Sequence, residues 1–205
     1  MDFVNGQIYH VYNRGNKSQT LFFTPENYQF FLAKIEETIK PYASILAWCL
    51  MPNHFHWLIK VENERLERAA PRKTSPKGPK SSPVSPTYST LNHSVAILLR
   101  VYTRMVNKED EKTGPLFHQP TRALCLSDPQ FEPDYFRNHF GIMDNDPLRE
   151  EDYPSLCFQY IHSNPVTGKL VENPEDWEFS SYRDYFCGRE GTLVNKALAE
   201  ELAIY

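Results

Sequence analysis

The sequence predicts an α+β fold, in which an antiparallel sheet carries helices on one face. Two patterns support this: strand-like runs rich in β-branched and aromatic residues, and longer runs with apolar residues at helical spacing. In chain order they read strand, helix, strand, strand, helix, strand, which is the ferredoxin-like split-βαβ order. With 205 residues, the chain is predicted to be one domain over 1–205.

The first three strands and the first helix are predicted before residue 62. Residues 6–15 form a strand that is closed by Asn-Arg-Gly, and a helix follows with Thr24 as its N-cap. Residues 42–50 and 54–61 are two further strands, and the short segment 51–53 joins them as a hairpin.

The second half of the chain supplies the remaining elements. Residues 89–108 have the spacing of an amphipathic helix, and residues 121–127 are the fourth strand. Another helix is predicted over residues 153–164, where Pro165 stops it. A C-terminal helix is predicted over residues 193–205. The C-terminal helices are thus additions to the split-βαβ core.

Two insertions interrupt this pattern. Residues 65–88 contain five prolines with many Ser and Lys, which predicts a disordered segment, and residues 128–152 are acidic. Between residues 60 and 104, nine Lys/Arg face three Glu (9 − 3 = +6), although the whole chain carries −4. A local basic surface suits a nucleic-acid backbone, but charge alone fits a solvated linker equally well.

Composition also bears on where the protein works. No apolar run approaches the roughly 18 residues of a membrane span, and the N-terminal residues lack the pattern of a signal peptide. The cysteines are widely separated, which favours reduced thiols over a disulfide or zinc framework: Cys49, Cys125, Cys157 and Cys187. We therefore expect a cytoplasmic protein that does not enter a membrane.

The stretch "MPNHFHWLI" places two histidines in a predicted strand. Because strand residues alternate between faces, His54 and His56 should point to one spot, with Phe55 on the opposite face. Two neutral imidazoles are part of a ligand set for a divalent cation, and they also fit a hydrogen-bonded core pair. Leu58 stands where a histidine-triad enzyme needs its third histidine, and no His-Glu-x-x-His zinc motif occurs.

Three motifs in order resemble the single-tyrosine HUH transposases, an IS200-like family that includes the REP-associated tyrosine transposases. These motifs are "YHVYNRG" (9–15), "MPNHFHWLI" (51–59) and "YIHSNPV" (160–166). Further similarity lies in "VYTRMVNK", "GPLFHQPTRAL" and the Trp-Ser-Ser-Tyr-like tail "DWEFSSYRDY". The resemblance covers most of the chain apart from the two insertions.

The resemblance implies a metal-dependent cleavage of single-stranded, hairpin-bearing DNA. Tyr160 matches the nucleophile that forms a 5′-phosphotyrosine link, and His54 and His56 match the histidines that hold Mg²⁺ or Mn²⁺. Asn164 stands where relatives commonly carry Gln as a third ligand, and as a residue before proline it could instead cap the helix end.

Other polar residues are candidate DNA contacts. Asn13 and Arg14 could contact DNA or only form the turn at the end of the first strand, and the basic candidates for phosphate contacts are Lys60, Arg100 and Arg104. His10 is expected to be a residue of the sheet and His162 a packing residue, and His118 is left without an assigned role.

Two alternatives remain open at this point. One is a DNA-binding module of the same fold without catalysis, and the other is a rolling-circle-type HUH nuclease. The family includes both monomers and exchanged dimers, so the resemblance allows either a monomer or a homodimer.

Overall fold

We analysed a computed structural model, which describes residues 2–68, 87–127 and 153–205. Its central feature is a four-stranded antiparallel sheet in the order β2-β3-β1-β6. The strands are β1 (Ile8–Arg14), β2 (Ala43–Met51), β3 (His54–Val61) and β6 (Arg122–Cys125). Two pairs of neighbouring strands, β1 with β3 and β1 with β6, are not consecutive in the chain. This order confirms the predicted ferredoxin-like class.

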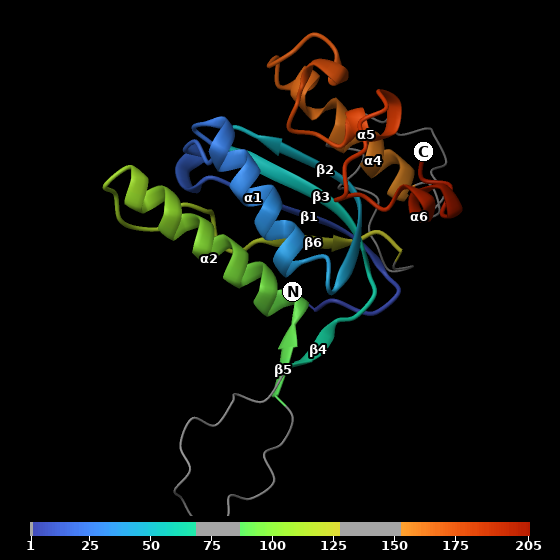
Figure 1. Cartoon of the computed structure of the whole chain (residues 1–205), viewed down its shortest axis with the longest axis horizontal. Coiled ribbons are helices and arrows are strands. Elements are labelled where there is room, and N and C mark those ends of the chain that lie inside the picture. Colours follow the sequence, from blue (N-terminus) through green and yellow to red (C-terminus); the bar gives the residue numbers. More distant parts are fainter. Residues whose placement is uncertain (1, 69–86, 128–152) are drawn as a thin grey trace, which may run out of the picture.

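Helices cover both faces of this sheet (Figure 1). Helices α1 (Pro25–Thr38) and α2 (Leu91–Glu109) pack side by side on one face, and α4 (Tyr153–Thr167) packs against β2 and β3 on the other. The shorter helices are α5 (Tyr182–Phe186), α6 (Lys196–Glu201) and the 3-10 turns Asn16–Ser18 and Pro174–Asp176. The added helix predicted at the C-terminus is therefore α4, on the face that the split-βαβ helices leave open.

The first helix of this layer begins where the sequence predicts, and the second begins at Leu91, two residues after the predicted start at 89, because residues 89–90 end strand β5 (Thr87–Thr90). Thr24 is the N-cap of α1 with extended backbone, and Pro25 follows at the first helical position. Thr90 caps α2, and its side-chain oxygen accepts a hydrogen bond from the His93 N–H at 3.1 Å. Both helices bury an apolar stripe against the sheet.

Strand alternation sorts the β3 side chains as expected. Phe55 and Trp57 are fully buried in the core beneath α1 and α2. His54 and His56 point to the opposite face, where Leu58 belongs to the core beneath α4. The histidines therefore lie between the sheet and α4.

The prediction that Pro165 stops the fourth helix is wrong, because α4 continues to Thr167 with this proline inside it. A proline lacks only its own N–H, so one turn of the helix loses a single hydrogen bond while the next turn closes normally. The helix end is closed by the Gly168 N–H, which donates to the Asn164 carbonyl at 2.7 Å.

The first insertion is ordered at its ends, which corrects the prediction of a structureless segment over 65–88. Strands β4 (Arg65–Arg68) and β5 (Thr87–Thr90) pair with each other in an antiparallel ladder, and Leu66 packs against the core. This hairpin joins the end of β3 to the start of α2. Residues 69–86 and the acidic stretch 128–152 lie outside the described residues.

A segment after α4 covers the outer edge of β2, which the sequence did not predict. The Phe179 carbonyl accepts a hydrogen bond from the Leu50 N–H, and the Ser181 N–H donates to the Trp48 carbonyl, each at 2.9 Å. The segment therefore protects an edge strand from pairing with other chains. Within the described ranges, no helix is long and apolar enough to cross a membrane.

Candidate metal and nucleophile site

Four side chains meet between the sheet and α4. His54 and His56 come from β3, and Tyr160 and Asn164 come from α4, more than a hundred residues later. The ring centroids of His54 and His56 are 5.1 Å apart, and Tyr160 lies edge-on to His56 with centroids 5.3 Å apart. The structure thus brings together the residues that the resemblance selected.

A pocket of about 470 Å³ opens over three of these side chains, His54, His56 and Tyr160. The residues that line it are Tyr12, Asn13, Arg14, Ser18, Asn53, His54, His56, His118, Pro120, Arg122 and Tyr160. Two of these described residues are arginines and none is a carboxylate, so the pocket favours an anionic group.

His54 is held between two amide side chains. Its Nδ1 lies 2.7 Å from the Asn53 Oδ1, and its Nε2 lies 3.4 Å from the Asn164 Oδ1. A neutral imidazole carries one proton. In one tautomer Nε2 donates to Asn164, and in the other Nδ1 donates to Asn53 and the lone pair on Nε2 faces the oxygen of Asn164. Burial lowers the pKa of His54, which disfavours a second proton on the ring. Two acceptors that face each other in this way fit a shared cation.

His56 has a histidine partner that the sequence did not reveal. His10 of β1 is fully buried, and its Nε2 lies 2.9 Å from the His56 Nδ1. When His56 donates from Nδ1 to His10 Nε2, its own Nε2 carries the lone pair that can bind a metal. His10 was expected to be a residue of the sheet, which its place in β1 confirms, and its contact with a candidate ligand was not predicted.

Asn164 does not cap the end of α4, as one interpretation of the sequence allowed. Its side-chain N–H donates to the Tyr160 carbonyl at 3.0 Å, one turn back along the helix. This bond directs the amide oxygen toward His54. An amide oxygen is a suitable hard ligand for Mg²⁺, so the residue fits the third position of a metal site.

The donor set is small. The described part of the chain contains no cluster of three His, Cys, Asp or Glu side chains that could hold a metal ion. The candidate set is therefore two imidazoles and one amide, with further positions open to water or to phosphate oxygens. Mg²⁺ and Mn²⁺ commonly keep several such ligands in sites that act on phosphates.

Tyr160 is a half-buried phenol above this donor set. Burial raises its pKa above the ordinary value of 10, and a hydrogen bond with Asn164 partly offsets this. At neutral pH the hydroxyl is therefore protonated and a poor nucleophile on its own. Chemistry at this oxygen requires a neighbouring positive charge or a proton acceptor.

A glycine turn aligns the strand ends that frame the pocket. The Gly15 N–H donates to the Asn53 carbonyl at 2.8 Å, which ties the end of β1 to the β2–β3 turn beside His54. A Cβ at Gly15 would overlap the carbonyl oxygen of Gln19, so only glycine fits there. This explains the glycine of the "YNRG" motif.

The residues predicted to contact DNA lie at different distances from the pocket, and not all of them have side chains free to bind DNA. Arg14 is exposed and lines the pocket. The Asn13 side chain donates to Thr121 Oγ1 at 2.7 Å and accepts from the Arg14 N–H, so it holds the loop together. Lys60 lies near the far end of β3, roughly 20 Å along the strand from His54.

Arg100 and Arg104 are exposed on α2 and line a groove beside the pocket, not the pocket itself. Arg122 of β6 lines both spaces, and sequence reasoning missed it. Its only signal in the sequence was its place in the fourth predicted strand. His118 also lines the pocket, close to Pro120.

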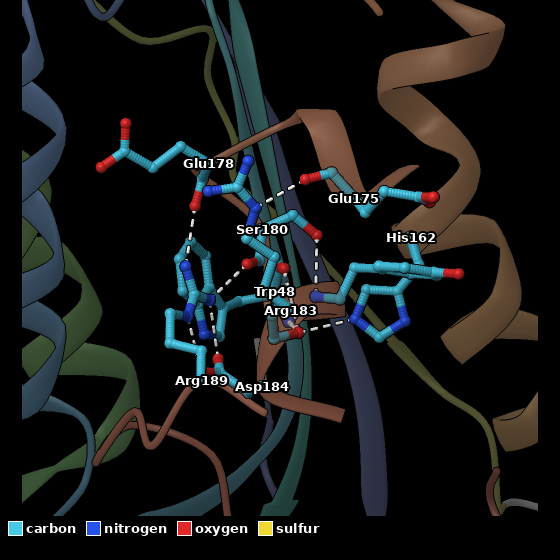
Figure 2. A network of polar contacts seen from close by, with 10 residues as sticks. Trp48, His162, Glu175, Glu178, Ser180, Arg183, Asp184 and Arg189 are labelled. Atoms are coloured by element: carbon cyan, nitrogen blue, oxygen red, sulfur yellow. Dashed lines mark hydrogen bonds and ion pairs between the residues drawn. The ribbon is translucent and has the colours of Figure 1, made fainter. Parts of the chain in front are cut away.

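The tail after α4 fixes this helix to the sheet. The Ser181 hydroxyl lies 2.7 Å from the His162 Nε2 and accepts a hydrogen bond from the Trp48 N–H at 2.9 Å. Figure 2 shows this link between β2 and the helix that carries Tyr160. Burial lowers the pKa of His162 to about 3, so its ring is neutral and serves packing, as predicted.

The same tail is closed by a buried ion pair. Asp184 is 2% exposed, and Arg189 binds both of its carboxylate oxygens, with Nε to Oδ1 at 2.6 Å and an Nη2 to Oδ2 at 2.8 Å. Arg189 also donates to the carbonyls of Glu178 and Ser180 (Figure 2). The pair holds the loop that carries Ser181 against β2.

Asp184→Ala is expected to lower the free energy of unfolding by about 2–3 kcal/mol, which urea unfolding measures. This is below the full cost of breaking a buried pair because the Arg189 side chain is 32% exposed. Arg183→Ala in the same helix is the control, since Arg183 is half-buried and its hydrogen bond to the Glu175 carbonyl is exposed to solvent. An equal loss in both variants would contradict the role given to Asp184.

The fold agrees with a solved structure of a REP-associated tyrosine transposase bound to a REP hairpin. The two chains share 15% identity and superpose with a TM-score of 0.52, over 95% of this chain and 92% of that chain. The chain has the fold of that transposase. No protein-family model and no curated protein matches the sequence. The similarity to this structure therefore concerns the fold. The roles of individual residues are argued from the distances and contacts of the site.

Proposed function

We propose that the protein is a metal-dependent single-stranded DNA endonuclease and strand transferase, with Tyr160 as the nucleophile. The observation that carries this proposal is the position of Tyr160 over two histidines and an amide oxygen, in a pocket that contains arginines. The transposase of the same fold is bound to a REP hairpin, which supports a hairpin-bearing DNA as the partner.

In the proposed reaction the Tyr160 hydroxyl attacks the scissile phosphorus in line with the leaving 3′ oxygen. The phenol loses its proton, a P–O bond to tyrosine forms, and the P–O3′ bond breaks. The 3′ oxygen takes up a proton, and a 5′-phosphotyrosine remains. The reverse attack by a 3′-OH rejoins strands without an external energy source because the covalent link conserves the bond.

Three residues would hold the metal ion: His54 and His56 through Nε2, and Asn164 through its amide oxygen. When bound, Mg²⁺ or Mn²⁺ supplies positive charge that stabilises the pentavalent phosphate and the developing phenolate. This binding requires both imidazoles to carry their proton on Nδ1, where Asn53 Oδ1 and His10 Nε2 can accept it. Arg14 and Arg122 are positioned to bind the remaining phosphate oxygens.

A trapping assay tests this function against a DNA-binding module that lacks catalysis. The protein is incubated with an end-labelled single-stranded DNA that forms a hairpin, in Mg²⁺, in Mn²⁺ or in EDTA, and then denatured. A labelled band that persists on a denaturing protein gel with metal and disappears with EDTA is the expected result. DNA binding in a native gel without any such adduct would favour the non-catalytic module.

A further inference from the structure

A second groove opens beside the candidate site, between α2 and the segment 115–123. Its volume is about 710 Å³, within the range of spaces that bind ligands. On the α2 side, Ala96, Arg100 and Arg104 are spaced by four residues and so form one stripe along the helix. Figure 1 shows α2 next to the β6 side of the sheet.

The groove is strongly basic. Arg100, Arg104 and Arg122 line it with exposed side chains, and none of its lining residues is a carboxylate. Across residues 2–68, 87–127 and 153–205, none of these arginines forms an ion pair. Three guanidinium groups without acidic partners in these ranges attract phosphates and can bind them bidentately.

Between the arginines the groove is apolar. Its accessible apolar lining comes from Ala96, Pro115, Pro120 and Ala123, and Val95, Leu99 and Leu116 lie buried beneath it. A single strand exposes the faces of its bases, which bind apolar surfaces, while its phosphates bind basic side chains. A duplex keeps the faces of its bases stacked inside and presents phosphates, sugars and base edges, so this apolar lining adds less to its binding. The combination favours an unpaired strand.

The groove adjoins the candidate site at the β6 edge of the sheet. Pro120 and Arg122 line both spaces. Arg122 is paired across the sheet with Tyr12, and Tyr12 with His56, so these three residues form one row on the same face. At about 4.8 Å per strand, β3 and β6 lie roughly 10 Å apart, a short distance for a DNA backbone to cross.

From these observations we propose that the groove binds the unpaired strand next to the scissile phosphate, leading it from Tyr160 past Arg122 to Arg100 and Arg104. This inference rests on the proposed function, because it takes the pocket over Tyr160 as the place where the phosphate lies. It adds the direction in which the single strand leaves the site and the residues that bind it.

Fluorescence anisotropy with Arg100→Ala/Arg104→Ala tests the inference. Three labelled probes are compared in EDTA: a blunt DNA hairpin, and the same hairpin with a 5′ or a 3′ single-stranded extension. We expect the variant to bind one of the extended probes about tenfold more weakly and the blunt hairpin as the wild type does. The slope of log affinity against log salt for that extended probe should become shallower by about 0.7 for each phosphate that the variant no longer neutralises.

The matched control is Lys34→Ala/Lys40→Ala, which removes the same charge from exposed ion pairs on and next to α1 and should bind all probes normally. Equal affinity of the Arg100/Arg104 variant and the wild type for both extended probes would overturn the inference, as would an equal loss for the blunt hairpin. A wild-type protein that binds these probes but forms no trapped adduct overturns only the proposed chemistry. One that binds none of them overturns both proposals.

Discussion

Tyr160→Phe is expected to abolish the covalent protein–DNA adduct, a loss of more than about 10³-fold, because the variant lacks the attacking oxygen. The phenyl ring fills the same space over His56, so folding and DNA binding should be retained. The rate of adduct formation by the wild type should rise with pH across the neutral range. The reason is that burial keeps the pKa of the phenol above 10, so each step up in pH increases the phenolate fraction.

Tyr12→Phe is the matched control for this variant. Tyr12 lies in the same pocket and its ring stacks near His56, with centroids 5.9 Å apart, so it is the other phenol that lines the pocket near the candidate metal ligands. Tyr12→Phe should still form the adduct. An adduct that persists in Tyr160→Phe and disappears in Tyr12→Phe would show that the nucleophile has been assigned to the wrong tyrosine.

His56→Ala is expected to remove most of the metal binding and to slow adduct formation by about 10²–10³-fold, since a bound cation contributes several kcal/mol to such reactions. Mn²⁺ binding, followed by electron paramagnetic resonance, should weaken in parallel with activity. The same experiment on Asn164→Ala tests whether the amide oxygen is the third ligand. Mn²⁺ binding to His56→Ala equal to that of the wild type would contradict this metal site.

His10 provides a graded version of the same test. His10→Leu removes the partner of the His56 Nδ1 and should weaken Mn²⁺ binding by about 10–100-fold, the usual effect of losing a residue that orients a metal ligand. His10→Gln can place an amide oxygen near the same position and should bind Mn²⁺ more tightly than His10→Leu. Equal Mn²⁺ binding in both variants would mean that His10 only fills space.

Part of this site could be predicted from local sequence. Strand alternation alone placed His54 and His56 on one face, because a period of two is a property of the backbone. Thr24 and Pro25 likewise determined where α1 begins. Tyr160 could not be selected in this way, since nothing in its local sequence distinguishes it from the other tyrosines. Only the resemblance to a family pointed to it.

Other residues required the tertiary structure. His10 becomes the partner of His56 only because β1 pairs with β3 in one register. Arg122 reaches the pocket only because β6 adds to the other side of β1. The prediction that Pro165 ends the helix is wrong because the packing of α4 against the sheet outweighs one missing hydrogen bond. In each case, interactions between distant segments decided the outcome.

The most direct test of the account is to locate the covalent bond. The wild-type adduct is digested with nuclease and trypsin, and the residual nucleotide is mapped by mass spectrometry. The peptide 150–169 contains Tyr153 and Tyr160, and its fragments distinguish the two. The nucleotide is expected on Tyr160. A nucleotide on Tyr153 or on any other residue would contradict it.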